Sequence, residues 1–196
     1  DNIPHITIRS FAKNTDEELA KLLQELKQDS PKGIILDVRN NLGGDVDAVV
    51  KVTDQFLDGG LVFYQEDGKK RRQDYVARPG GLFTTIPLVV LVNEFSASGS
   101  EVLAAALQAN ERATIVGTKT YGKGSVGIIN KLSDGSGINF TIARWHTPTG
   151  DLIEGIGLTP DRIVPLDSSS TGDMQLDVAM EIIMDAISSK QSRLRQ

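Results

Sequence analysis

The stretch Ile86–Glu101 constrains the fold most, because it reads as a strand that runs directly into a helix. Leu88–Val92 is an unbroken apolar run of strand length without polar alternation, which is typical of a strand covered on both faces. Val102–Gln108 is rich in alanine and leucine, and both residues favour a helix. The sequence therefore predicts a layered fold in which a buried strand leads into a helix.

Strand and helix patterns alternate along the rest of the chain. A capping box at Thr15 and Glu18, followed by leucines at helical spacing, predicts a helix over Thr15–Gln28. We also expect strands over Ile3–Ser10, Gly33–Val38 and Thr114–Gly117, hairpins over Leu61–Val76 and Val126–Arg144, and a last helix over Met174–Ile187. This order predicts an α/β fold with a mixed sheet and flanking helices.

Three serines, Ser96, Ser98 and Ser100, lie at the corner between the central strand and its helix. A serine at the start of a helix lies next to free backbone N–H groups and the positive end of the helix dipole. That position suits an oxygen nucleophile whose reaction develops negative charge. Ser98 and Glu101 also have the spacing of a capping box, so the same serine can be a simple helix cap. The spacing alone leaves both interpretations open.

A second candidate motif places Lys123 between Gly122 and Gly124. Glycines allow a tight turn and the close approach of another element, so we expect a lysine held there to be partly buried. Burial favours the neutral amine, which can accept a proton. By itself, however, this tripeptide is equally typical of a surface turn.

A glycine turn, Asn40–Gly44, separates the strand Gly33–Val38 from a helical pattern that runs from Val46 to Leu57. A strand, a glycine turn and a helix together present backbone N–H groups at the end of a sheet. The alternative is a plain turn that needs glycine for its backbone angles. Phosphate binding is a weaker interpretation, since neither common glycine-rich phosphate motif is present.

Taken in order, Asp37–Gly44, Asn93–Glu101 and Tyr121–Gly124 resemble the carboxyl-terminal processing (tail-specific) serine proteases. Gly155–Asp161 resembles the closing loop of that family, and the similarity extends over most of the chain. The resemblance implies a crotonase/ClpP-like core. We accordingly expect residues 1–166 to form a catalytic core, and residues 167–196 to be a linker and a C-terminal helix that packs on the core or extends from it.

The resemblance also implies roles for individual residues. Ser98 corresponds to the nucleophile and Lys123 to the general base of a Ser–Lys dyad, with no metal or cofactor. One N–H of the oxyanion hole corresponds to Gly99 and the other to Gly43 or Gly44, between which the sequence does not choose. A Ser-His-Asp triad is the competing serine chemistry, but neither His5 nor His146 lies in a recognisable triad motif.

Two positions depart from the family pattern. Many members carry a glutamine four residues after the lysine, where it helps to hold the dyad, and this chain has Gly127 there. Some members carry an acidic residue in the helix after the nucleophile, at the position of Ala109. Because the serine and the lysine are intact, we expect a serine endopeptidase that cleaves proteins near their C-terminal tails. The alternative is a catalytically weak or non-catalytic crotonase-like domain that binds acyl groups or peptides.

Composition and resemblance together limit the expected partners. The net charge of -5 gives no electrostatic support for nucleic-acid binding. The absence of cysteine excludes disulfides, thiol catalysis and thiolate metal sites. The resemblance implies protein or peptide substrates with apolar C-terminal tails, an extracytoplasmic location in the periplasm or cell envelope, and a PDZ-type domain upstream of Asp1. We therefore expect a core cut from a longer protein, and homo-oligomers are a further expectation.

Overall fold

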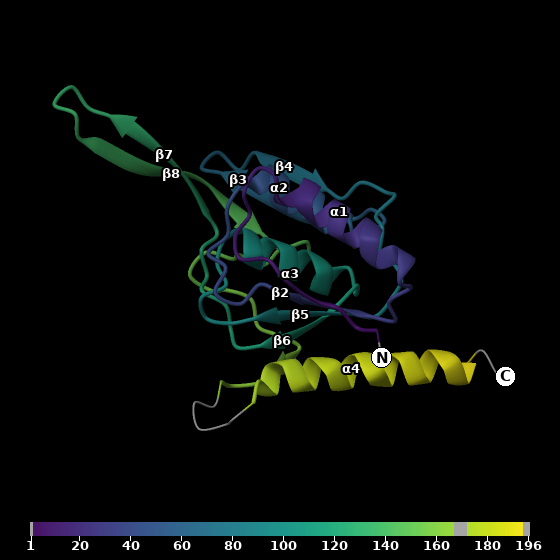
Figure 1. Cartoon of the computed structure of the whole chain (residues 1–196). Coiled ribbons are helices and arrows are strands. Elements are labelled where there is room, and N and C mark those ends of the chain that lie inside the picture. The colour runs from purple at the N-terminus through teal and green to yellow at the C-terminus, as the bar shows by residue number, and fades with distance from the viewer. Residues whose placement is uncertain (1, 167–171, 194–196) are drawn as a thin grey trace.

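A computed structural model describes residues 2–166 and 172–193 of the chain (Figure 1). The strands are β1 (His5–Thr7), β2 (Ile34–Asp37), β3 (Leu61–Asp67), β4 (Arg72–Val76), β5 (Leu88–Val92), β6 (Thr114–Gly117), β7 (Ser125–Lys131), β8 (Gly137–His146) and β9 (Arg162–Ile163). The helices are α1 (Thr15–Gln28), α2 (Val46–Asp54), α3 (Gly99–Ala109) and α4 (Met174–Arg193). No helix in the described ranges is both long and apolar enough to cross a membrane.

A five-stranded parallel sheet forms the centre of the fold, with the strand order β1-β2-β5-β6-β9. Every residue of β2 and β5 is buried. This confirms the prediction from the unbroken apolar runs, because a strand that is covered on both faces has no reason to alternate with polar residues.

Helices cover both faces of the parallel sheet. Figure 1 shows α1, α2 and α3 on one side of it and α4 on the other. Leu36 and Val90 pack in the main core with residues of α1, α2 and α3, whereas Ile35 and Leu91 pack against α4. Successive residues of one strand point to opposite faces, so β2 and β5 serve both layers. The C-terminal helix is therefore packed on the core; residues 167–171 of the predicted linker lie outside the described residues.

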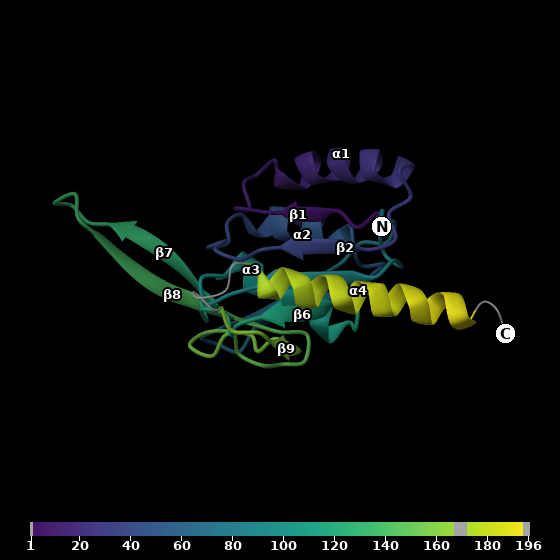
Figure 2. The ribbon, with the colours of Figure 1, turned by 60° about the horizontal axis from the view of Figure 1, so that its bottom comes forward.

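The remaining strands form an antiparallel sheet with the order β4-β3-β8-β7. The predicted combination of parallel and antiparallel strands with flanking helices is thus confirmed, with the two kinds of strand in separate sheets. Both predicted hairpins are present, and that of β7 and β8 reaches well beyond the rest of the molecule (Figures 1 and 2).

Element boundaries differ from expectation at a few places. β1 has only three residues instead of the predicted Ile3–Ser10, and β9 was not predicted. Both are edge strands with a single neighbouring strand. Few contacts with the sheet therefore constrain which residues they contain. The helix α3 starts at Gly99, directly after Ser98, and α4 continues past Ile187 to Arg193.

Candidate active site

The three sequence motifs meet at one edge of the parallel sheet. The loops that follow β2, β5 and β6 carry them, and the carboxyl ends of neighbouring parallel strands lie at the same edge. Backbone hydrogen bonds join these loops: the Ala97 N–H donates to the Asn41 carbonyl at 3.0 Å, and the Tyr121 N–H donates to the Ser96 carbonyl at 3.1 Å. The structure therefore brings the predicted site segments together.

Ser98 is the N-cap of α3 and has a strained backbone, with φ 57° and ψ −116°. A residue with a side chain rarely adopts such a conformation, and strain of this kind collects at functional sites. A sharp strand-to-helix turn at a serine presents its hydroxyl at the edge of a sheet. The N–H of the next residue, Gly99, has no hydrogen-bond partner among the described residues.

The glycine turn after β2 packs directly against this serine. A Cβ atom on Gly43 would lie 2.7 Å from both the Gly99 nitrogen and the Ser98 Cβ, so only glycine fits there. Its N–H donates to the Asn41 Oδ1 at 2.8 Å. By contrast, the N–H of Gly44 has no hydrogen-bond partner in the described part of the chain.

Asn41 holds the two loops in place, although its sequence pattern indicates only a turn. Its side chain is fully buried and donates from Nδ2 to the Ile8 carbonyl at 2.8 Å. Its own carbonyl accepts from the Ser100 Oγ at 2.8 Å as well as from Ala97. The geometry of the glycine turn is thus tied to the first turn of α3.

Lys123 is exposed, which corrects the expectation that its flanking glycines would bury it. The glycines bury the backbone only: a Cβ on Gly122 would lie 3.0 Å from the Gly157 nitrogen, and one on Gly124 would lie 2.5 Å from the Glu154 nitrogen. Among the described residues, no hydrogen bond joins the Lys123 Nζ to the Ser98 Oγ. The side chain of the lysine faces solvent while its loop is firmly packed.

Glu101 connects the serine to the lysine through their backbones. Its carboxylate is completely buried, and Oε2 accepts from the N–H groups of Ser98 and Lys123, each at 2.8 Å. Oε1 accepts from the Gly122 N–H at 2.7 Å and from the Thr120 hydroxyl at 2.6 Å. Sequence reasoning identified Glu101 only as part of a capping box, and a capping pattern carries no signal for donors from a distant loop.

The remaining sequence candidates lie apart from this contact network. The imidazole of His5 contacts Asp37 at 3.0 Å, and that of His146 contacts the Gly150 carbonyl at 3.2 Å, so neither touches Ser98. Gly127 lies on β7, where a Cβ atom would be 2.6 Å from the Asn139 Oδ1. A glutamine at this position would therefore require Asn139 to move.

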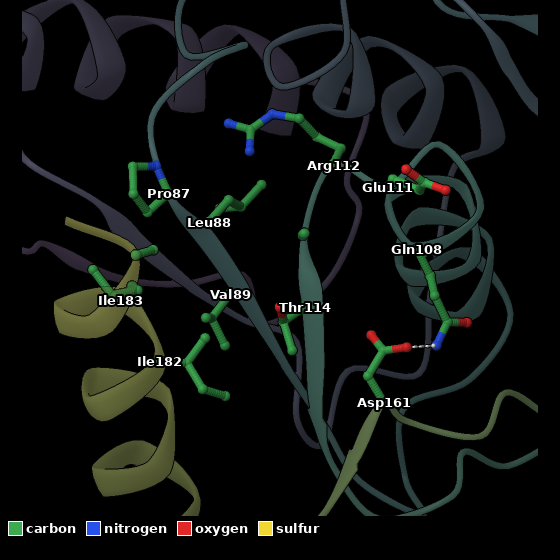
Figure 3. Close-up of a pocket in the computed structure, with 12 residues that line it drawn as sticks. Pro87, Leu88, Val89, Gln108, Glu111, Arg112, Thr114, Asp161, Ile182 and Ile183 are labelled. Atoms are coloured by element: carbon green, nitrogen blue, oxygen red, sulfur yellow. Dashed lines mark hydrogen bonds between the residues drawn. The ribbon is translucent and has the colours of Figure 1, made fainter. Parts of the chain in front are cut away.

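A pocket of about 420 Å³ lies at the opposite edge of the sheet, near the amino ends of β5 and β6 (Figure 3). Two of its charged side chains are already engaged in hydrogen bonds. Arg112 donates to the carbonyls of Phe56, Phe83 and Ile86, and Asp161 accepts from Gln108 and from the Ile115 N–H. The pocket contains no predicted site residue, and its Arg112 and Asp161 side chains hold the fold together.

A strained serine at the start of a helix, beside unpaired backbone N–H groups, is typical of hydrolases that act through a serine nucleophile. The chain belongs to peptidase family S41, whose sequence model matches residues 2–164. It is 37% identical over 192 residues to a carboxyl-terminal-processing protease of Synechocystis sp., covering 95% of this chain and 45% of the relative. It is also 40% identical over 157 residues to the chloroplastic C-terminal processing peptidase of Tetradesmus obliquus, covering 80% and 34%. The chain thus spans about half the length, or less, of these curated relatives.

Solved structures confirm the fold class. The photosystem II D1 C-terminal processing protease superposes with a TM-score of 0.79 at 36% identity, covering 94% of this chain and 47% of that protein. A peptidase from Parabacteroides merdae gives the same TM-score at 21% identity, covering 93% and 61%, and shows the fold alone. The predicted crotonase/ClpP-like core and the predicted family are both confirmed.

Proposed function

We propose that this chain is the catalytic core of a serine endopeptidase that uses Ser98 as nucleophile and Lys123 as general base. The observation that carries the proposal is the buried Glu101 carboxylate, which accepts from the backbone N–H groups of both residues. A helix cap alone has no need to hold a lysine loop. A single rigid acceptor that fixes the serine and the lysine relative to each other is what a two-residue mechanism requires.

In the proposed reaction the neutral amine of Lys123 takes the proton from the Ser98 hydroxyl, and Oγ attacks the carbonyl carbon of the scissile peptide bond. The proton then passes to the leaving amine, which departs and leaves an acyl-enzyme. Lys123 next takes a proton from water, whose oxygen attacks the ester carbonyl. The bond from that carbon to the Ser98 Oγ breaks, Oγ recovers the proton from Lys123, and the acid product leaves. A polypeptide bound over the exposed lysine would exclude water from the amine, which the protein alone does not do.

We assign the oxyanion hole to the N–H groups of Gly99 and Gly44. Both lie at this edge of the sheet, and neither has a hydrogen-bond partner in the described ranges. The N–H of Gly43 already donates to Asn41, while its missing side chain leaves room for Ser98. Two free donors aimed at the developing negative charge stabilise the tetrahedral intermediate, and each such donor is typically worth about a hundredfold in rate or more.

The substrates and location are proposed on the strength of the relatives. Their printed names describe carboxyl-terminal processing, and one solved relative is named for processing the photosystem II D1 protein. We propose that this chain cleaves protein substrates near apolar C-terminal tails, outside the cytoplasm. A PDZ-type domain in the rest of a longer protein, and assembly into homo-oligomers, belong to the same proposal.

Labelling with a fluorophosphonate probe, followed by cleavage of an unfolded protein with an apolar tail, tests the proposed chemistry. Ser98→Ala is expected to remove both signals, while Ser10→Ala on the exposed surface retains them. Lys123→Arg is expected to abolish cleavage because a guanidinium stays protonated, whereas Lys119→Arg in the same loop remains active.

The exposure of Lys123 and its lack of a bond to Ser98 favour one alternative, a non-catalytic domain that binds acyl groups or peptides. Retention of cleavage in Ser98→Ala would exclude the proposed nucleophile. Binding of the unfolded substrate without labelling or cleavage, by the unmodified chain, would establish the alternative instead.

A further inference from the structure

The hairpin of β7 and β8 extends beyond the rest of the antiparallel sheet. β8 pairs with β3 only through residues 143–146, and its residues 137–142 pair only with β7. β7 is the outermost strand of this sheet. Residues 127–142, called the arm from here on, therefore form a two-stranded ribbon whose outer edges have no strand partner in the described ranges. Figures 1 and 2 show the arm projecting away from the other elements.

The arm has an apolar surface that faces solvent. Alternate residues of a strand share a face, so Ile138 and Phe140 lie on one side of the ribbon, and Ile128 on the same side is paired with Phe140. Soluble proteins rarely expose a contiguous apolar surface without using it, and a hairpin of two strands is only marginally stable alone in water. The exposed large apolar side chains of the arm are Ile128, Ile129, Leu132, Ile138, Phe140 and Ile142.

The edges of the arm lack the charges that usually protect an exposed strand. The other hairpin of the same sheet carries three ion pairs, Lys70–Glu66, Arg71–Asp67 and Arg72–Asp74. In the arm, Lys131 is the only charged residue within the strands, and Asp134 lies in the turn. Charged edges discourage a further strand from pairing, and uncharged edges admit one. An uncharged segment is therefore the partner that the arm fits best.

The root of the arm lies at the lysine loop. β7 begins at Ser125, the second residue after Lys123, and the Gly124 carbonyl accepts from the Trp145 N–H of β8 at 2.6 Å. A polypeptide bound at Ser98 would thus pass close to the start of the β7 edge. We propose that the arm binds an uncharged, extended segment of the polypeptide substrate as an additional β-strand. This inference rests on the proposed function and names the surface that grips the substrate away from the scissile bond.

Strand addition predicts a specific kind of selectivity. Main-chain hydrogen bonds supply affinity without regard to sequence, and the apolar face favours apolar side chains on the added strand. Salt screens interactions between charges, so this binding should keep its strength at high salt. The ligand class is therefore an unfolded, uncharged and β-prone segment.

The test measures binding by fluorescence anisotropy, using the Ser98→Ala chain to prevent cleavage. The probe is a short fluorescein-labelled peptide of valine, threonine and serine, compared with the same peptide N-methylated at alternate backbone amides. The double variant Ile128→Thr with Phe140→Thr removes apolar surface but keeps residues that favour strands. The matched control is Val76→Thr, because Val76 is 54% exposed on the charged hairpin.

We expect the double variant to weaken peptide binding by about tenfold or more, and the Val76→Thr control to change it by less than about twofold. N-methylation of the peptide should weaken binding to the unaltered arm by a similar factor, and this comparison does not depend on how the variants fold. Equal affinity of the two peptides, or of the double variant and its control, would overturn the proposal. A concentration-dependent dimer that the double variant loses in sedimentation would assign the arm to a second copy of the chain instead.

Fluorophosphonate labelling of Ser98 separates this inference from the proposed function. Normal labelling of the double variant, together with weakened peptide binding, is the expected result, because the arm does not form the nucleophile. The unmodified chain could instead bind the peptide through the arm without being labelled. In that case the bound segment is not the substrate of a serine peptidase, and the proposal that the arm binds substrate is overturned.

Discussion

Two charged groups stand at opposite ends of α3, the buried Glu101 and the half-buried Arg112, and they are held in opposite ways. Glu101, in the first turn, is a carboxylate that accepts hydrogen bonds from three backbone N–H groups and one hydroxyl. Arg112, just past the last turn, is a guanidinium that donates to three backbone carbonyls. Burial lowers the pKa of Arg112 to about 10. Neither group has an ion-pair partner among the residues that the structure describes.

The difference lies in what each charge holds together. Glu101 joins the serine turn to the lysine loop, whereas Arg112 joins segments that contain Phe56, Phe83 and Ile86, at the other end of the sheet. A buried charge is costly unless it is fully hydrogen-bonded, so each is retained where several backbone groups must be fixed at once. Both suit the helix dipole, which favours a negative charge at the amino end and a positive charge at the carboxyl end. One end of α3 therefore fixes the segments of the proposed active site, and the other joins segments of the core.

The largest effect is expected from Glu101→Gln. The change replaces one carboxylate oxygen by an amide NH₂ group. Whether that group takes the place of Oε1 or of Oε2, it faces N–H or O–H donors, so at least one pair of donors is left unsatisfied. Each such loss costs about 1–3 kcal/mol, and the lysine loop should shift relative to Ser98. A displacement of about 1 Å can lower the rate on the order of a hundredfold. We therefore expect kcat/KM to fall by about that factor, measured on the folded fraction.

The matched control for this change is Glu111→Gln, which removes an exposed carboxylate near the other end of α3. It should leave both activity and stability nearly unchanged. Wild-type activity in a folded Glu101→Gln variant would contradict this expectation, because it would show that the serine and the lysine do not need a shared acceptor.

Arg112→Lys should have the second largest effect, on stability and not on chemistry. The positive charge is kept, but an ammonium cannot reproduce the planar fork that reaches three carbonyls. We expect the free energy of unfolding to fall by about 3 kcal/mol, measured by urea denaturation, with activity per folded molecule within about twofold of wild type. Arg162→Lys on the exposed β9 is the control. A loss of activity as large as that of Glu101→Gln would mean that the two ends of α3 are not separate.

Much of the fold could be predicted because its strands are extreme in composition. The continuous apolar run of β5 indicates a strand, and the leucine spacing of α1 indicates a helix. The structure confirms the strand at Leu88–Val92 and the helix at Thr15–Gln28. The short edge strands could not be predicted in the same way. β9 has two residues, both exposed, so neither length nor hydrophobic pattern marks it as a strand.

The candidate site was predictable only as a set of segments. The resemblance of the motifs located Ser98, Lys123 and the glycine turn, and the parallel strands bring their loops to one edge of the sheet. The acceptor that joins them was not predictable, because Glu101 reaches residues about twenty positions away that only the tertiary fold brings near. The exposure of Lys123 was missed because flanking glycines indicate close backbone packing and say nothing about the side chain.

A smaller loss of activity is expected from Thr120→Val, which changes one hydrogen bond at the Glu101 end of α3. The Thr120 hydroxyl donates to the Glu101 Oε1 at 2.6 Å and accepts from the Leu158 N–H at 2.7 Å. Valine keeps the shape but leaves that N–H unsatisfied, at a cost of about 1–3 kcal/mol. Since Glu101 keeps its three backbone donors, activity should fall only about tenfold. Thr120→Ser retains the hydroxyl and should stay near wild type; equal losses in both variants would point to packing instead of the hydrogen bond.

The smallest expected effect concerns a third charged group, the half-buried Arg39, which is paired with carboxylates and not with backbone. Its guanidinium contacts Asp37 at 2.6 Å, at the end of β2, and Asp173 at 2.8 Å, just before α4. Burial by itself lowers the pKa of Arg39, but the hydrogen bonds with Asp37 and Asp173 outweigh it and raise the pKa above its usual value. The hydrogen bond from Arg39 in turn lowers the pKa of Asp173. A carboxyl group with a lowered pKa stabilises the fold above its unfolded value, about 3.9, and loses that contribution as the pH falls through the folded value.

Asp173→Asn tests this pair without removing the helix cap, because the Asp173 Oδ1 accepts from the Leu176 N–H and asparagine caps helices equally well. The side chain of Asp173 is 36% exposed, so the loss of stability at neutral pH should be below about 1 kcal/mol. The loss should shrink toward zero as the pH falls and the wild-type carboxyl is protonated, as measured by urea midpoints across the acid range.

The control Asp185→Asn, on the exposed side of α4, should show no such trend. Arg112→Lys should show an almost constant loss over the same range, because the carbonyls that Arg112 contacts do not titrate. If the loss of stability in Asp173→Asn does not depend on pH, the helix cap and not the ion pair is responsible for it. Arg39 would then stabilise the fold independently of pH, as Arg112 does.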